Sequence, residues 1–184
     1  MAILIMETFW KELIYKERSG KGLYSYKNGN SYEGQWLNDK KHGIGKMKYQ
    51  NGDFYHGEYQ SDTKEGEGIY VWSNKNRYSG NWKNGRRQGK GVLIIQRTGE
   101  KYIGQWEEDK IVQGRWILIN KDYFEGTFEN NMPYGKGCWT VGGKTFEGNY
   151  EQFENEFKGY NLKMLKNEFF NEEVIPWKLK WVSN

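Results

Sequence analysis

The chain has 184 residues, enough for one domain or one short repeat array, and is rich in Gly (24), Trp (9), Tyr (14) and Phe (9) but has only 2 Pro. Its hydrophobic share of 36% is low for an aliphatic core, while its aromatic share of 17% argues against a disordered chain. The net charge of +4 comes from 28 basic and 24 acidic side chains, without the concentrated basic footprint of a nucleic-acid-binding protein. We therefore expect a glycine-punctuated β-protein whose apolar surface consists mainly of rings.

The first predicted element is a degenerate half-repeat over residues 9–31, in which Gly20 and Gly22 lie 11 and 13 residues after Phe9. From there on, an aromatic-x-Gly triplet with a second aromatic two residues later recurs every 22–24 residues. It starts six times, at Tyr32, Tyr55, Tyr78, Tyr102, Phe124 and Phe146. Eleven residues after most starts comes a Gly-x-Gly, at Gly43/Gly45, Gly66/Gly68, Gly89/Gly91 and Gly135/Gly137. This register predicts a repeat array over residues 1–150, with a partial repeat at residue 146.

Within each unit, period-two alternation predicts a β-hairpin. The first strand places Tyr32, Gly34 and Trp36 on one face, and the second is expected to begin near Gly43, after a polar loop over residues 37–42. Turn-forming Asn-Gly pairs, at Asn28-Gly29 and Asn51-Gly52, connect successive units. The expected fold is all-β: an elongated single-layer antiparallel meander of hairpins.

The repeated glycines have a physical reason in such a sheet. A large ring on one strand needs a shallow site on the cross-strand neighbour, and a residue without Cβ supplies it. A lone hairpin is marginally stable, so stability must come from stacking units that each touch only their neighbours. We expect a ladder of Tyr and Trp lying over Gly.

Two places depart from the pattern. In the fourth unit, residues 112–116 carry one glycine instead of two and lack one residue, so we expect a local kink or change of twist there. After Tyr150 the repeat stops, and residues 151–184 are expected to form a short irregular or helical tail for docking or capping. The segment from Leu162 to Phe170 is the expected position of a short helix.

The 23-residue unit Tyr-x-Gly-x-Trp, followed by Gly-x-Gly, resembles the MORN repeat (membrane occupation and recognition nexus) over roughly residues 9–150. The eroded Gln113-Gly114, the runs 117–123 and 131–137 and the tail segment 175–178 together resemble the MORN proteins of radial spoke heads. That resemblance implies a non-catalytic scaffold of the ciliary or flagellar axoneme that supports motility. Its partners would be other radial spoke head proteins in a large complex, with homodimerisation left open.

The sequence contains few of the residue types that catalysis or metal binding requires, with two His and one Cys. His42 and His56 are 14 residues apart, and with Cys138 as the single cysteine we expect no zinc site, no cofactor and no enzyme activity. Each Gly-x-Gly lacks the third glycine and the following helix of a phosphate-binding loop. We interpret Cys138 as an inert strand thiol.

A lipid-binding adaptor is the alternative function. Lys40-Lys41-His42, Arg86-Arg87 and Lys46/Lys48 could meet anionic head groups, but Asp62, Glu65 and residues 107–109 make the loop edge mixed in charge. We therefore disfavour membrane lipid as the ligand, and also consider an adaptor for a membrane-associated or cytoskeletal partner.

Protein binding is the function favoured by the residues, because a single sheet cannot cover its own aromatic face. Open sheet ends add sites for strand addition. The expected contact residues are Trp36, Tyr49, Trp72, Trp82 and Trp106 in the array and Pro176, Trp177 and Trp181 in the tail. One cysteine, no signal-peptide pattern at residues 1–6 and no long apolar stretch predict a protein of the cytoplasm and cytoskeleton.

Overall fold

The computed structural model describes residues 17–154 and 160–165, and the following account is confined to them. They form thirteen strands in a single antiparallel sheet, in which each strand pairs with the next one along the chain. The strands are β1 (Gly20–Ser25), β2 (Ser31–Leu37), β3 (Lys40–Lys48), β4 (Phe54–Gln60), β5 (Thr63–Val71), β6 (Arg77–Lys83), β7 (Arg86–Ile94), β8 (Lys101–Glu107), β9 (Lys110–Ile117), β10 (Tyr123–Glu129), β11 (Met132–Val141), β12 (Lys144–Glu154) and β13 (Tyr160–Leu165).

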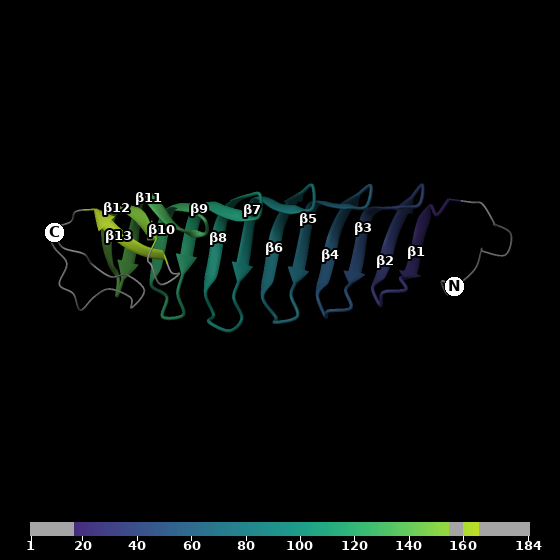
Figure 1. The fold of residues 1–184 in the computed structure, drawn as a ribbon, viewed down its shortest axis with the longest axis horizontal. Helices are drawn as coiled ribbons and strands as arrows, with labels where there is room; N and C mark the ends of the chain where they lie inside the picture. The colour runs from purple at the N-terminus through teal and green to yellow at the C-terminus, as the bar shows by residue number, and fades with distance from the viewer. Residues whose placement is uncertain (1–16, 155–159, 166–184) are drawn as a thin grey trace.

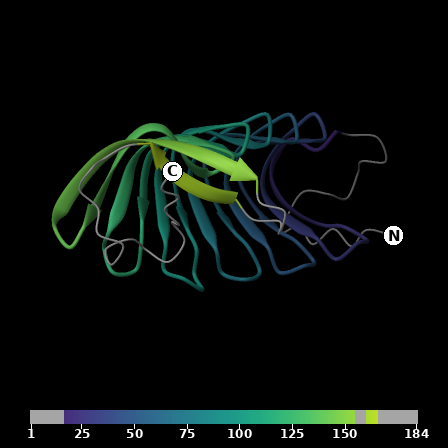
Figure 2. The same ribbon diagram turned by 60° about the vertical axis from the view of Figure 1, so that its left-hand side comes forward.

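Figure 1 shows the strands side by side along one long axis, without a second layer in the described part of the chain. Figure 2 shows that they curve strongly along their length, so that the sheet is arched in cross-section. This architecture confirms the predicted all-β, elongated, single-layer antiparallel meander. No described helix is long and apolar enough to cross a membrane.

The second strand of each unit begins earlier than the sequence predicts. β3 starts at Lys40 rather than near Gly43, and a two-residue turn, Asn38-Asp39, replaces the expected six-residue loop. Both turn residues have positive φ, 48° and 62°, as a type I′ hairpin turn requires. The early start is possible because an irregularity in the pairing takes up the extra residues inside the strand.

That irregularity is a β-bulge, and the first glycine of Gly-x-Gly forms it. Gly34 pairs with Gly45, but the next residue of β2, Gln35, pairs with His42, so Gly43 and Ile44 are extra residues on β3. Gly43 has φ +59°, a left-handed conformation that glycine adopts without strain. The two glycines of the motif therefore have different roles, since only the second lies under a ring.

The missing residue of the fourth unit is accommodated by a smaller bulge. Gln105 still pairs with Gln113, and Trp106 pairs with Ile111, so only Val112 is extra on β9. The sheet remains continuous through this unit, and the departure from the repeat is a bulge one residue shorter than the two-residue bulge of β3.

The sheet extends past the end of the predicted array. β12 runs to Glu154 and pairs with β13 from Glu154↔Tyr160 to Asn149↔Leu165. The boundary predicted at residue 150 therefore lies inside a strand. The expected helix from Leu162 is wrong over its first four residues, because they pair with β12 as a strand; residues 166–170 lie outside the described residues.

Candidate interaction surface

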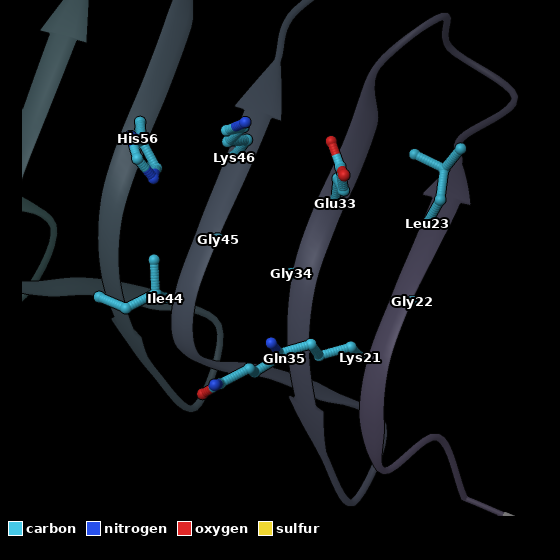
Figure 3. A pocket seen from close by; sticks show the side chains of 10 residues that line it. All are labelled: Lys21, Gly22, Leu23, Glu33, Gly34, Gln35, Ile44, Gly45, Lys46 and His56. Atoms are coloured by element: carbon cyan, nitrogen blue, oxygen red, sulfur yellow. The ribbon is translucent and has the colours of Figure 1, made fainter.

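The two faces of the sheet differ in character. The face away from the Tyr and Trp ladder carries a hollow of about 800 Å³ over β1–β4, as Figure 3 shows. Side chains in two rows flank the backbone of Gly22, Gly34 and Gly45. The rows consist of Leu23, Glu33, Lys46 and His56 on one side and Lys21, Gln35 and Ile44 on the other. This outer face is mixed in charge, and its side chains alternate with the inward rings of the same strands.

The inner face buries the aromatic ladder almost completely. In four triplets the first ring lies over two glycines, and these rings are Tyr32, Tyr55, Tyr78 and Phe124. An ideal Cβ on Gly68, for example, would lie 2.6 Å from Cζ of Tyr55. Tyr55 is fully buried, and its hydroxyl donates to the carbonyl oxygen of Glu58 at 3.1 Å. Edge-to-face contacts link the rings within a strand, as for Tyr55–Tyr59 on β4 with centroids 5.2 Å apart, and between strands, as for Tyr55–Trp82 at 5.3 Å.

The sheet is bent around this face, because residues at opposite ends of the strands meet there. Lys41 lies near the start of β3 and Tyr26 follows the far end of β1, yet the Lys41 Nζ is 6.0 Å from the centre of the Tyr26 ring. Likewise, the Arg87 guanidinium at the start of β7 is 5.9 Å from the ring of Trp72, just beyond β5. The rings are therefore enclosed between the two arms of each bent strand.

A row of basic residues covers one side of the ladder. Its members stand two positions before the first glycine of the first four Gly-x-Gly pairs and lie over aromatic rings: Arg18, Lys41, Lys64 and Arg87. The Arg87 guanidinium, for example, is 4.7 Å from the ring of Trp106. Cations over ring faces are attracted by the ring quadrupole, which offsets part of the cost of removing them from water.

Carboxylates in the tight turns pair with three of these cations. Asp62, in the turn after β4, accepts the backbone N–H of Lys41 at 2.9 Å and lies 3.0 Å from its Nζ, and its own N–H donates to the Lys41 carbonyl at 3.0 Å. Asp39 binds Arg18 and Asp109 binds Arg87 in the same way. These reciprocal contacts clamp each hairpin to the next.

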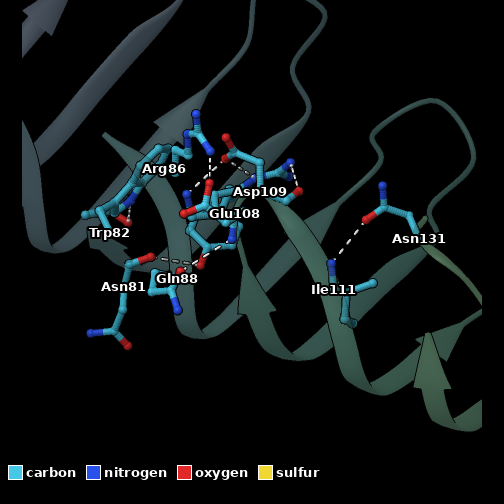
Figure 4. Close-up of polar contacts among 11 residues, drawn as sticks. Asn81, Trp82, Arg86, Gln88, Glu108, Asp109, Ile111 and Asn131 are labelled. Carbon is cyan, nitrogen blue, oxygen red and sulfur yellow. Dashed lines mark hydrogen bonds and ion pairs between the residues drawn. The ribbon is translucent and has the colours of Figure 1, made fainter. Parts of the chain in front are cut away.

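Figure 4 shows the clamps on the later hairpins. Asp109 lies in its turn beside the ion pair between Arg86 and Glu108, and in the next turn the Asn131 side chain accepts the backbone N–H of Ile111 at 3.1 Å. Ile111 occupies the place of the cation in that unit and is buried. The cation row thus ends at β7, and the second half of the array is neutral at this position.

A second set of clamps runs along the opposite edge. Asp53 is buried and accepts the Tyr70 hydroxyl at 2.6 Å and the Ser73 backbone N–H at 2.8 Å. Asn30 and Asn76 occupy equivalent positions and accept backbone N–H groups twenty residues further along the chain. Burial acts to raise the pKa of Asp53, but the hydrogen bonds from Tyr70, Ser73 and Asn51 together lower it.

The chemistry of these groups fits structural roles. Burial raises the pKa of Tyr32 and of Tyr78 to about 12, so both rings stay neutral. Burial also raises the pKa of the Cys138 thiol, which therefore lacks thiolate character at neutral pH. Among the described residues, no three His, Cys, Asp or Glu side chains lie close enough to hold a metal ion.

The structure divides the predicted contact residues into three groups. Trp36, Trp82 and Trp106 are core, with exposed fractions of 7%, 5% and 1%. Tyr49 and Trp72 pack against the core but are half-buried. The tail residues Pro176, Trp177 and Trp181 lie outside the described residues. Only the second group presents described surface to a partner.

The inward cations are the side chains of this surface that the sequence does not predict. Polarity indicates that Lys41 and Arg87 are loop charges available to head groups, but both lie on the inner face and are paired with Asp62 and Asp109. A signal was present, because a basic residue stands two positions before Gly20, Gly43, Gly66 and Gly89.

A family model for the MORN repeat matches six segments, which together cover more than half of the chain: residues 14–31, 32–54, 55–77, 78–95, 102–112 and 124–140. Five of these segments begin at the predicted repeat starts. A search of curated proteins gave no match.

Proposed function

The chain belongs to the MORN-repeat family, and we propose that within this family it acts as a non-catalytic scaffold that binds other proteins through its inner face. The observation that carries this proposal is the row of half-buried rings at and just beyond the ends of β3 and β5. Tyr49, Tyr70 and Trp72 pack against the core cluster but remain partly exposed. Rigid rings with a polar surround have the composition of protein interface hot spots.

The finer form of the proposal is a radial spoke head component of the axoneme, with other radial spoke head proteins as partners. Its support is the resemblance carried by the eroded fourth unit, the last two runs of the array and the tail segment 175–178. The array itself is compatible with any elongated assembly and does not favour the radial spoke over others, because its hairpins present similar surfaces at regular intervals.

Proximity labelling in ciliated cells tests both levels. The full chain should label axonemal spoke proteins, and Trp72→Ala should reduce that labelling while leaving the sheet folded, because Trp72 lies at the margin of the core. Tyr134→Ala removes a comparable ring from another exposed site and is the matched control. Labelling that survives Trp72→Ala contradicts the inner face as the binding surface; labelling of junctional membrane proteins instead contradicts the spoke assignment.

The tail has its own test. Deleting residues 174–184 should leave the sheet folded and weaken assembly with partners, as circular dichroism and co-sedimentation would measure. Unfolding of the array on deletion, or unchanged assembly, would show that the tail is not a docking segment.

Anionic phospholipid is the second candidate ligand, favoured by Lys21 and Lys46 beside the outer hollow. Against it, Glu33 lies in the same hollow and cross-strand from Lys46. Sedimentation with phosphatidylserine vesicles at about 0.15 M salt should leave the chain in solution. Co-sedimentation under those conditions would favour the lipid ligand.

A further inference from the structure

One cation of the inner row differs from the other three. Arg18, Lys41 and Arg87 each pair with an aspartate in the turn of the next hairpin, at N–O distances of 2.7, 3.0 and 3.1 Å. The corresponding turn beside Lys64 is Asn84-Gly85, so glycine occupies the aspartate position. Among the described residues, no carboxylate forms an ion pair with the Lys64 ammonium, and Asp109 acts on it only at longer range, across its own ion pair with Arg87.

The backbone at this place is otherwise unchanged. Gly85 donates its N–H to the Lys64 carbonyl at 3.0 Å, as Asp62 does to Lys41, and its φ of +79° is close to the +71° of Asp62. The nearby Glu65 carboxylate accepts the backbone N–H of Asn84 at 2.8 Å. The missing element is therefore the carboxylate alone, in a setting that three other units complete.

Rings hold Lys64 in position on the inner face. Its Nζ lies 4.2 Å from the ring centre of Trp82, 4.8 Å from that of Tyr70 and 5.5 Å from that of Tyr55. Burial lowers the pKa of Lys64, because partial removal from water disfavours its charged form. Trp72 lies against Tyr70 at a tilt of 50°, with ring centroids 4.8 Å apart, and extends this half-buried surface.

We propose that the Lys64 site, defined as Lys64, Tyr70, Trp72 and the turn at Gly85, binds a carboxylate side chain of a partner protein, presented by an extended acidic segment. The inference rests on the proposed function and names the chemistry of the partner. The charge complementarity is specific, because the partner's carboxylate completes the ion pair that Asp39, Asp62 and Asp109 form internally elsewhere. A neighbouring apolar side chain of the segment would cover the exposed edge of Trp72.

An aspartate introduced at Gly85 tests whether the Lys64 site binds a partner's carboxylate. An ideal Cβ on Gly85 meets only Thr63 Cγ2, at 3.8 Å, so a side chain fits there, and aspartate adopts the same backbone conformation in the equivalent turns. Gly85→Asp should therefore supply the missing carboxylate and compete with the partner. Lys64→Met removes the cation but keeps an apolar side chain against the rings. Lys83→Met removes one exposed positive charge from the adjacent outward position and is the charge-matched control.

The probe is a phage-displayed library of random peptides of about twelve residues, long enough when extended to span several hairpins. Selection against the full wild-type chain should enrich peptides with Asp or Glu next to an apolar residue. The synthetic peptide with the strongest enrichment should bind Lys64→Met and Gly85→Asp at least about tenfold more weakly, and Lys83→Met with unchanged affinity. Circular dichroism and thermal denaturation of each variant establish that the loss is not unfolding.

Four results would overturn the inference. Enriched peptides without a preferred acidic position, or binding unaffected by both Lys64→Met and Gly85→Asp, would refute the Lys64 site and leave the proposed scaffold function standing. Binding of phosphatidylserine vesicles that depends on Lys64, without acidic peptides, would identify a lipid head group as the occupant. A library that yields no binder on wild-type protein would contradict the inference and the proposed function together.

Discussion

Adding a single methyl group at Gly68 should destabilise the middle of the array. A Cβ at Gly68 would lie 2.6 Å from Cζ of Tyr55 and 2.7 Å from its Cε2, closer than real Cβ atoms approach. The Tyr55 ring is fully buried, so it can yield only by disturbing its edge-to-face contacts with Tyr59 and Trp82. Overpacking of a core costs about 1–3 kcal/mol and each aromatic contact about 0.5–1.5 kcal/mol. We expect Gly68→Ala to lower the free energy of unfolding by about 2–3 kcal/mol.

Gly22→Ala is the matched control, because Gly22 holds the same place in the half-repeat. A Cβ there would meet the Trp36 indole at 3.8 Å, an ordinary contact. Its backbone is not left-handed, so alanine should leave stability unchanged or raise it by up to about 1 kcal/mol. Urea denaturation followed by tryptophan fluorescence, with hydrogen exchange of the β4 and β5 amides, measures both variants.

A double-mutant cycle decides the mechanism. In a Tyr55→Leu background the cost of Gly68→Ala should shrink, because the ring that the new methyl group meets is gone. An undiminished cost, a Gly68→Ala protein as stable as wild type, or an equally damaging Gly22→Ala would each refute the ring-over-glycine argument.

Further expectations concern the clamps at the two edges. Gly85→Asp should raise the free energy of unfolding by about 0.5–1.5 kcal/mol, because it adds an acceptor for the Lys64 N–H; an unchanged or lower thermal midpoint would contradict this. Asp53→Ala should lower it by about 1–3 kcal/mol through unsatisfied buried donors, whereas Asp53→Asn should retain the clamp that Asn30 forms in its own unit; similar losses in both variants would argue against the clamp. The pKa of Asp53 is lowered by folding, so its carboxylate stabilises the sheet above the unfolded pKa of about 4, and this contribution is lost as pH falls through the folded pKa. As the pH is lowered, the thermal midpoint should therefore fall less steeply for Asp53→Asn than for wild type. Parallel curves of midpoint against pH would exclude this role of the carboxylate.

The aromatic ladder was predictable from residue order because its geometry is local. Tyr32 and Trp36 are four residues apart on one strand, and strand alternation alone places them with Gly34 on the same face. Both are core residues in the structure, although Trp36 is among the residues expected to contact a partner. Only the extent of burial was underestimated, because the bend that encloses the rings depends on contacts between distant ends of strands.

The turns were less predictable because a run of polar residues can form either a loop or an exposed, paired strand. Residues 37–42 contain no apolar alternation and so indicate a loop, yet Asn38-Asp39 forms a two-residue turn and the rest of the run is paired strand. The pairing depends on the left-handed conformation of Gly43, whose bulge lets the strand gain residues without losing register. The pattern of polar and apolar residues does not predict the left-handed conformation of Gly43.

The inward cations could not be found from charge alone. A lysine in a polar run is ordinarily solvated, and Lys41 becomes an inner-face residue only because rings from neighbouring strands receive it. Those rings, Tyr32 and Tyr59, lie on β2 and β4, on either side of its own strand. The recurrence of a basic residue two positions before the first four Gly-x-Gly pairs becomes informative once the register of the strands is known.

The clamps along both edges give the array a mechanical character. Each hairpin is fastened to the next by its own turn residue, as Asp62 fastens β4–β5 to Lys41. Tension applied to the two ends of the sheet would therefore peel it from its edges, releasing one hairpin after another. Each release frees a 23-residue unit, roughly 80 Å of extended chain, so the array would lengthen in regular steps under load. An elongated MORN sheet built this way would act as an extensible tether in addition to its proposed role in binding.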